Sequence, residues 1–323
     1  MNVSLHSEDR NDYYAIAELN ALTFNYGYGM GETCLISLLR NRQTFDPDLS
    51  IVARIDGRID GRIVGHVLFT PQPVLFKGKL LQAVILAPLV VHPEFQNQGI
   101  GSKLVEEGIR RCIEKGFDLS LVLGHSEYYS RFGYRPNMWS SASLHIAMSD
   151  IPTLQTTVSE RRLEERDVPA LRAMWEDWFV DSEMAIAPGD SVLDWISCDR
   201  GVRASALSMN GELVGYIRYD TSNPSRIISF LAKDSIAFTH MSSYMKSLLR
   251  ATELETLELP LHPLSKGVRS IVNLPYTSNI ITGEVRMLRV LNKNEELHRY
   301  CDEVDNGKTT PGSILWPVEF DVL

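Results

Sequence analysis

Hydrophobic and polar positions along the first part of the chain predict strands and helices in alternation. The expected elements are a strand at residues 3–8, helices at 12–25 and 31–43, and an apolar run at 51–70. Asp56-Gly57 and Asp60-Gly61 interrupt that run. Asp-Gly pairs favour tight turns because glycine accepts a positive φ, so we expect the run to fold as a β-hairpin.

A second group of elements follows the hairpin. Residues 81–91 are almost continuously apolar, which is typical of a strand buried on both faces, and Pro93 lacks the N–H needed to continue it. Residues 100–115 place apolar side chains on one helical stripe and charged ones on the other face, and Gly116 ends the helix. Residues 119–123 predict one more buried strand. Together these elements indicate an α/β protein with a mixed sheet.

The length of 323 residues fits two domains of about 150 residues each. A Pro- and Thr-containing stretch at 151–157 interrupts the pattern, so we place the domains at residues 1–155 and 156–323. The segment 211–217 echoes 61–67 in the same order and at similar spacing. The start of the predicted second domain, Glu164-Glu165-Arg166-Asp167, likewise echoes Glu8-Asp9-Arg10-Asn11, and each precedes a helix. A diverged tandem repeat is the interpretation we favour.

The loop between the strand at 81–91 and the helix at 100–115 contains two glycines. The start of a helix leaves backbone N–H groups unpaired and carries the positive end of the helix dipole, so it suits a phosphate. Gly99 and Gly101 would let a phosphate approach the backbone, since they have no Cβ. A dinucleotide fingerprint would need glycine where Leu104 stands, and a P-loop needs Gly-Lys-Ser/Thr rather than Gly101-Ser102-Lys103. Both of these alternatives are disfavoured.

The spacing Gln96-x-x-Gly99-x-Gly101 resembles the Q/R-x-x-G-x-G/A signature of the GNAT superfamily of acyl-CoA N-acyltransferases. Further along, the segment 122–136, VLGHSEYYSRFGYRP, resembles the YhbS-like bacterial branch of that superfamily. The resemblance covers about residues 1–150. It implies the GNAT fold for this part of the chain and acetyl-CoA as cosubstrate, with no metal.

The resemblance also implies which residues hold the coenzyme. Backbone amides of the glycine loop bind the pyrophosphate, and the preceding strand pairs with the pantetheine arm as another strand would. The implied coenzyme-binding residues are Leu89, Val90, Val91, Gln96, Asn97, Gln98, Gly99, Ile100, Gly101, Ser102 and Lys103.

For the chemistry, the family pattern matches Tyr129 to the tyrosine that protonates the departing thiolate, whereas Tyr128 is expected to pack as an apolar neighbour. Many relatives carry a Glu on or beside the strand before the loop as the base, and this chain has none there. The candidates that remain open for the base are His92, His125, Glu127 and the carboxylate of Leu323. Val122 stands where many relatives have an Asn.

The second half resembles a GNAT domain without its coenzyme loop, because residues 234–238 contain no glycine. Such a tandem arrangement resembles the Eis-type acetyltransferases, in which the degenerate domain helps to shape the acceptor pocket. Phe24, Tyr26 and Tyr28 alternate with glycines in a segment that commonly overlies the acceptor in this fold.

Charge and cysteine content narrow the partners. The net charge of −9, with no cluster of Lys and Arg, argues against nucleic acid and mildly favours a cationic acceptor. The four cysteines are scattered without a C-x-x-C pair, which indicates a reducing cytoplasm and no metal site, and no stretch suits a membrane span. A homo-oligomer is compatible with the sequence.

These observations predict a cytoplasmic acetyl-CoA-dependent N-acetyltransferase acting on a small primary amine. Two alternatives remain open at this point. One is a non-catalytic acyl-CoA-binding sensor or assembly module, which the lack of a base on the strand favours. The other is a tandem GNAT enzyme that acetylates a thiol-bearing metabolite.

Overall fold

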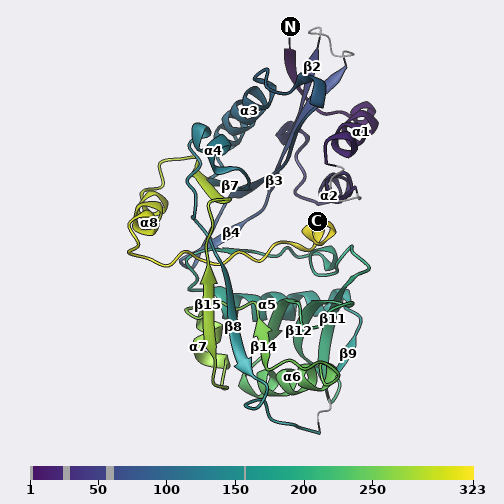
Figure 1. The fold of residues 1–323 in the computed structure, drawn as a ribbon, viewed down its shortest axis with the longest axis vertical. Helices are drawn as coiled ribbons and strands as arrows, with labels where there is room; N and C mark the ends of the chain where they lie inside the picture. Colours follow the sequence, from purple (N-terminus) through teal and green to yellow (C-terminus); the bar gives the residue numbers. More distant parts are fainter. Residues whose placement is uncertain (1–2, 25–29, 56–61, 156–157) are drawn as a thin grey trace.

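A computed structural model of the chain describes residues 3–24, 30–55, 62–155 and 158–323. The Asp-Gly turns predicted within 56–61, and Tyr26 and Tyr28, lie outside the described residues. We call residues 1–155 the first half and residues 156–323 the second half. Figure 1 shows the sheet of the first half above those of the second half, with the N-terminus at the top of the view and the C-terminus near mid-height between the halves.

The first sheet is mixed, as predicted. Its strands, in spatial order, are β1 (Val3–Ser7), β2 (Ser50–Ile55), β3 (Ile63–Pro71), β6 (Ala83–Val91), β7 (Leu119–Leu123) and β16 (Arg286–Val290). Only β6 and β7 are parallel, because helix α3 (Ile100–Glu114) carries the chain back between them. The predicted hairpin is confirmed by the antiparallel pairing of β2 with β3.

Helices cover both faces of this sheet. Val52 of β2 packs with α1 (Tyr13–Thr23) and α2 (Gly31–Arg40), while its neighbours Ile51 and Ala53 belong to the core cluster of α3. This alternation is the period-two pattern of a strand buried on both faces. The predicted helix at 31–43 was three residues too long: α2 ends at Arg40, and the Asn41 side chain binds the Ser37 carbonyl at the last turn.

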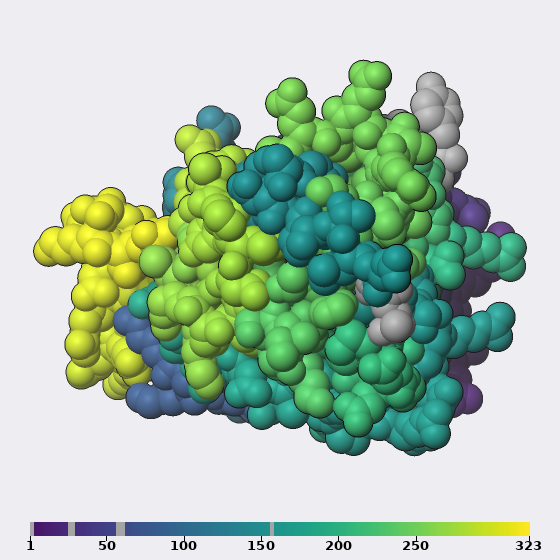
Figure 2. Space-filling model, turned by 90° about the horizontal axis from the view of Figure 1, so that it is seen from below, coloured from purple at the N-terminus to yellow at the C-terminus, as the bar shows by residue number. Residues whose placement is uncertain are grey.

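The two halves exchange strands, which the sequence did not predict. Strand β8 (Ser141–Ala147) leaves the first sheet and pairs with β14 (Thr256–Leu259) and β15 (Thr277–Ile281). In return, β16 from the second half completes the first sheet beside β7. In Figure 2, the teal surface of residues around β8 accordingly lies among the green surface of later residues.

The second half repeats the layout of the first. Its main sheet has the order β13 (Ile227–Ala232), β12 (Glu212–Asp220), β11 (Val202–Met209) and β9 (Val158–Arg161), with α5 (Val168–Phe179) and α6 (Ser235–Leu248) packed on it. Gly65 of β3 lies against Leu104 of α3, and Gly215 of β12 lies against Met241 of α6. Glycine at these two positions lets a helix approach the centre of the sheet.

The helix starts of the two halves also correspond. Asp9 with Asp12, and Glu164 with Asp167, form capping boxes that open the segments leading into α1 and α5. The structure therefore aligns Glu164 with Asp9, one residue later than the match to Glu8 made from the sequence.

The remaining strands and α-helices are divided between the two halves. They are β4 (Val74–Phe76), β5 (Lys79–Leu81), α4 (Ser126–Tyr129), β10 (Ala185–Ile186), α7 (Lys266–Ile271) and α8 (Glu295–Asp305). The final residues run between the halves, and a 3-10 helix at Val318–Val322 packs against α2 (Figure 1). Ion pairs of Arg42 with Glu319 and of Arg218 with Asp321 hold this segment to both halves.

Candidate functional site

Strands β6 and β7 separate soon after they begin to pair. Their parallel register covers only Ala83–Ile85, although β6 continues to Val91. His92 donates to the carbonyl of Val64 on β3, and peptide groups alternate in direction along a strand. The N–H and C=O groups of Leu89 and Val91 therefore point away from β3, into the gap beyond residue 85. The Val91 carbonyl accepts from the Gln96 side chain, so both backbone groups of Leu89 and the Val91 N–H are the ones that face the gap without this contact. This strand edge can pair with an extended ligand.

The loop after β6 leads directly to the start of α3. Gly99 adopts φ 80°, and no side chain caps the helix start. A Cβ on Gly99 would meet no atom within 4 Å, so the glycine is required by its backbone conformation and the space beside it is open. The first turn contains no acidic residue and carries Lys103, a charge that the helix dipole disfavours at this end unless an anion is present.

The side chains of the loop hold it in shape. Gln96 donates to the carbonyl of Val91 at 3.1 Å, and Gln98 donates to the carbonyl of Glu94 at 3.2 Å. Asn97 takes a positive φ of 60°. The backbone amides from Gln98 to Ser102 thus surround an uncapped helix start, which is the geometry that receives a phosphate.

Helix α4 contains two adjacent tyrosines, Tyr128 and Tyr129, whose side chains lie in different surroundings. Tyr129 is 8% exposed, and its ring lies so close to Gly124 that a Cβ there would be 2.3 Å from it. Gly124 directly follows β7, so this ring borders the gap from the β7 side. Burial raises the pKa of Tyr129, and the neighbouring Tyr128 raises it further. Tyr129 is therefore protonated at neutral pH and able to donate.

Tyr128 is not simply an apolar neighbour. Its ring packs edge-on against Tyr129, with centroids 5.0 Å apart, but its hydroxyl reaches the first turn of α3. A Cβ on Gly101 would lie 2.7 Å from that hydroxyl. Sequence reasoning assigned Gly101 only to the approach of a phosphate, whereas the structure shows that it also makes room for Tyr128.

The candidate bases occupy different surroundings. The Nε2 atom of His92 lies 2.9 Å from the Arg62 guanidinium, and its Nδ1 atom accepts a hydrogen bond from the Glu94 N–H. Both ring nitrogens are therefore engaged. His125 and Glu127 are exposed on the turn that begins α4. Leu323 lies against α2, where its side chain would be 3.1 Å from a Cβ on Gly31.

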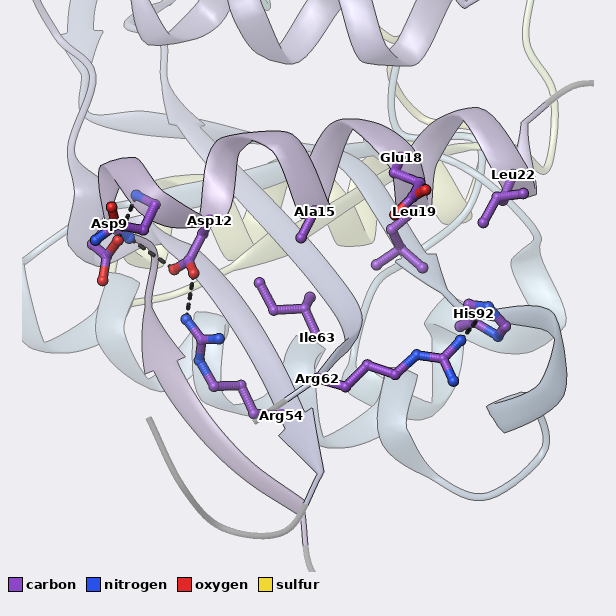
Figure 3. Close-up of a pocket in the computed structure, with 11 residues that line it drawn as sticks. Asp9, Asp12, Ala15, Glu18, Leu19, Leu22, Arg54, Arg62, Ile63 and His92 are labelled. Atoms are coloured by element: carbon purple, nitrogen blue, oxygen red, sulfur yellow. Dashed lines mark hydrogen bonds and ion pairs between the residues drawn. The ribbon is translucent and has the colours of Figure 1, made fainter. Parts of the chain in front are cut away.

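A cavity of about 510 Å³ lies under α1, next to His92. Figure 3 shows Asp9, Asp12 and Arg54 at one end and Glu18 and His92 at the other. Asp12 is paired with Arg54, and Asp9 closes the capping box that precedes α1. Three carboxylates stand in this cavity against two guanidinium groups, counting Arg62 at the His92 end.

Within the described residues, no group of three or more His, Cys, Asp or Glu side chains is arranged to hold a metal ion. In the same part of the chain, no helix is both long and apolar enough to cross a membrane.

Taken together, the site combines an open strand edge, an uncapped helix start and a protonated tyrosine beside the same gap. This arrangement suits an elongated ligand that carries an amide-containing arm and a phosphate. The loop motif was recognisable in the sequence. The position of the Tyr128 hydroxyl was not, because it depends on how α4 packs against α3.

Comparison with known proteins places this arrangement in context. Residues 13–134 match the model of the acetyltransferase (GNAT) family. The uncharacterized N-acetyltransferase YjhQ of Escherichia coli K12 is 36% identical over 135 residues, which cover 41% of this chain and 70% of YjhQ. The uncharacterized N-acetyltransferase YhbS of the same organism is 39% identical over 69 residues, 21% of this chain and 40% of YhbS.

Solved structures extend the likeness to the second half. A probable N-acyltransferase of unknown function from Enterococcus faecalis V583 aligns with a TM-score of 0.66 at 13% identity, covering 90% of this chain and 73% of its own. Eis1 from Mycobacterium abscessus aligns with a TM-score of 0.55 at 14% identity, and the alignment covers 90% of this chain and 74% of Eis1. At this level of identity the likeness concerns the fold. The expected resemblances to YhbS-like and Eis-type proteins are confirmed.

Proposed function

The chain belongs to the GNAT family of acetyltransferases, and we propose that it transfers the acetyl group of acetyl-CoA to a small primary amine. The amine nitrogen attacks the thioester carbon directly, the carbon–sulfur bond breaks, and coenzyme A leaves as the thiol. The observation that carries this proposal is the convergence of the open β6 edge, the α3 start and Tyr129 on one gap in the first sheet.

The coenzyme is bound by the first half, in an extended form. Leu89 to Val91 pair with the pantetheine arm through the backbone groups that face the gap. The amides of the loop from Gln98 to Ser102 bind the pyrophosphate, and Lys103 adds positive charge. Gln96 and Asn97 hold the loop in shape.

Tyr129 donates a proton to the departing thiolate. Its place beside Gly124, at the end of β7, supports this role. Burial keeps the hydroxyl protonated, so the proton is present when the thiolate departs. The residue acts in the transition state and contributes little to coenzyme affinity. Residues 156–323 form a GNAT-like domain without a coenzyme loop that shares strands with the first.

A small cationic amine is the acceptor that the charge distribution favours. The chain carries a net charge of −9, and the cavity under α1 is lined by three carboxylates and two guanidinium groups. Asp12 is paired with Arg54, so Asp9 and Glu18 are the carboxylates that favour a cation there. Because the ammonium form cannot attack, the amine must lose a proton before the transfer.

The proposal is tested by measuring acetyl-CoA turnover with a panel of primary amines, with thiols included, for wild type, Tyr129→Phe and Tyr134→Phe. We expect turnover with amines in the wild type. Tyr129→Phe should lower kcat by about 10²- to 10⁴-fold and leave coenzyme affinity nearly unchanged, because a proton donor acts in the transition state. Tyr134→Phe is the matched control, since it removes another buried hydroxyl, bonded to Ser120.

Near-wild-type kcat in Tyr129→Phe would remove that residue from the chemistry. Coenzyme binding without turnover of any acceptor would favour the non-catalytic sensor instead. Turnover restricted to thiols would show that the acceptor is a thiol and not a primary amine.

A further inference from the structure

The hydroxyl of Tyr128 stands at the first turn of α3, next to the place where the coenzyme phosphates are proposed to bind. A Cβ on Gly101 would lie 2.7 Å from this hydroxyl and 3.5 Å from Val91. Tyr128 therefore reaches the point where the open edge of β6 meets the start of the helix. The ring is half-buried between Tyr129 and Phe132, so its orientation is fixed by packing.

Arg131 lies over the same ring. Its guanidinium carbon is 4.6 Å from the centroid of Tyr128, and its Nε donates to the Tyr128 carbonyl at 3.2 Å. Within the part of the chain that the structure describes, Arg131 forms no ion pair with a carboxylate. Arg110 and Arg111 of α3, by contrast, both bind Glu107. The Arg131 guanidinium is thus positioned by these contacts, and no carboxylate among the described residues pairs with it.

We propose that Tyr128 and Arg131 together form a clamp for the phosphate groups of the coenzyme. The Tyr128 hydroxyl donates a hydrogen bond to a pyrophosphate oxygen at the start of α3, and the Arg131 guanidinium neutralises phosphate charge beside it. This assignment rests on the proposed function and adds two residues from α4 and the turn after it. Neither is contained in the glycine loop.

Burial keeps the Tyr128 hydroxyl protonated. It raises the pKa of Tyr128, and Ser102 and Arg131 offset the rise only in part. Tyr128 can therefore donate to a phosphate at neutral pH.

The clamp also gives Gly101 a purpose. A side chain on Gly101 would displace the Tyr128 hydroxyl, which lies within 3 Å of where the Cβ would be. The second glycine of the motif is then needed for the tyrosine as well as for the ligand. An effect of Gly101→Ala on coenzyme affinity should act largely through Tyr128.

The experiment measures dissociation constants by calorimetry for acetyl-CoA, acetyl-3′-dephospho-CoA and acetyl-pantetheine. Tyr128→Phe and Arg131→Gln should each weaken acetyl-CoA binding about tenfold, as expected for a hydrogen bond or ion pair with a charged group. Arg131→Lys should recover most of the loss. Binding of acetyl-pantetheine, which has no pyrophosphate, should not change, and the dephospho compound shows whether Arg131 contacts the 3′-phosphate. Arg110→Gln is the matched control.

Unchanged acetyl-CoA affinity in both variants, or an equal loss with acetyl-pantetheine, would overturn the clamp. A wild-type protein that binds no coenzyme at all would instead overturn the proposed function. In a double-mutant cycle, Gly101→Ala and Tyr128→Phe should not have multiplicative effects, because the phenylalanine lacks the atom that the new Cβ displaces. Effects that multiply would contradict the placement of Tyr128 over Gly101.

Discussion

The junction of β6 with α3 and the junction of β13 with α6 have the same layout, but only the first is open. At the first, Gly99 leaves the helix start uncapped. At the second, the Asp234 side chain accepts a hydrogen bond from the Ala237 N–H at 2.8 Å and thereby caps α6. A carboxylate of the protein thus occupies the position that a phosphate would take.

The strand edges at the two junctions differ in the side chain that contacts them. The Val91 carbonyl accepts from Gln96, which is exposed and belongs to the loop. Ala232 of β13 pairs with Gly215 as Val91 of β6 pairs with Gly65, so these two residues correspond. In the second half, the buried indole of Trp178 donates to the Ala232 carbonyl at 2.8 Å and fills the space beside Gly267. Counted from the two capping boxes, the position of Trp178 matches Thr23 on α1.

The comparison teaches that this βα unit needs two openings to serve as a coenzyme site. The helix start must lack a side-chain cap, and the strand edge must not be covered by a large side chain. The second half closes both openings with its own residues and keeps the fold. We therefore expect a single coenzyme site in each chain.

Converting the first junction into a copy of the second should have the largest effect. In Gly99→Asp, a carboxylate stands at the uncapped start of α3, whereas Gly99→Asn has nearly the same shape without the charge. Both residues tolerate a positive φ better than other side chains do. At about 4 Å a like charge costs roughly 4 kcal/mol at an effective dielectric constant of 20, so acetyl-CoA should bind Gly99→Asp at least about 100-fold more weakly than Gly99→Asn. Calorimetric titration measures the difference.

Equal affinity in the two variants would mean that the phosphates do not bind at this helix start. The difference should shrink at high salt, because screening weakens repulsion between partly exposed charges.

Acid should have a smaller effect, on stability, and it should come from a residue that only the first half has. His66 on β3 is fully buried, binds Ser50 through Nε2, and lies 3.8 Å from Glu8. Burial, with a contribution from Arg40, lowers the pKa of His66 to about 3. Tyr216 takes the matching place on β12 and donates to the Trp195 carbonyl.

The direction in which pH changes the stability follows from proton binding. Unfolded His66 has a pKa near 6.5, so the unfolded chain binds more protons than the folded one below that pH, and stability falls as pH falls. Between pH 6.5 and 5 the loss from this residue is about 2 kcal/mol. Denaturant unfolding of wild type and His66→Gln at both pH values measures it. A variant that loses as much stability as the wild type over this range would show that His66 is not responsible.

Local pattern predicted much of the first half. The apolar run before Pro93, the amphipathic helix ended by Gly116 and the strand at 119–123 are confirmed, because short-range periodicity determines such elements. The repeat was detectable through Gly65 and Gly215, which meet the same steric need in both halves.

Long-range pairing was not predictable in this way. The exchange of β8 and β16 joins segments that are more than a hundred residues apart in sequence, and no local signal specifies such partners. The closure by Trp178 depends on α5 lying beside β13, and the place of the Tyr128 hydroxyl depends on α4 lying beside α3. Both required the assembled structure.

The most direct test of the two junctions is the stoichiometry of acetyl-CoA binding by calorimetry, in wild type and in Asp234→Ala. Removing the N-cap of α6 should cost about 1 kcal/mol of stability, seen in thermal unfolding, and should not create a second site, because Trp178 still covers the strand edge. The account predicts one acetyl-CoA per chain in both proteins. Two acetyl-CoA molecules bound per wild-type chain would contradict it. Binding of one molecule to Gly99→Asp with unchanged affinity would contradict it as well.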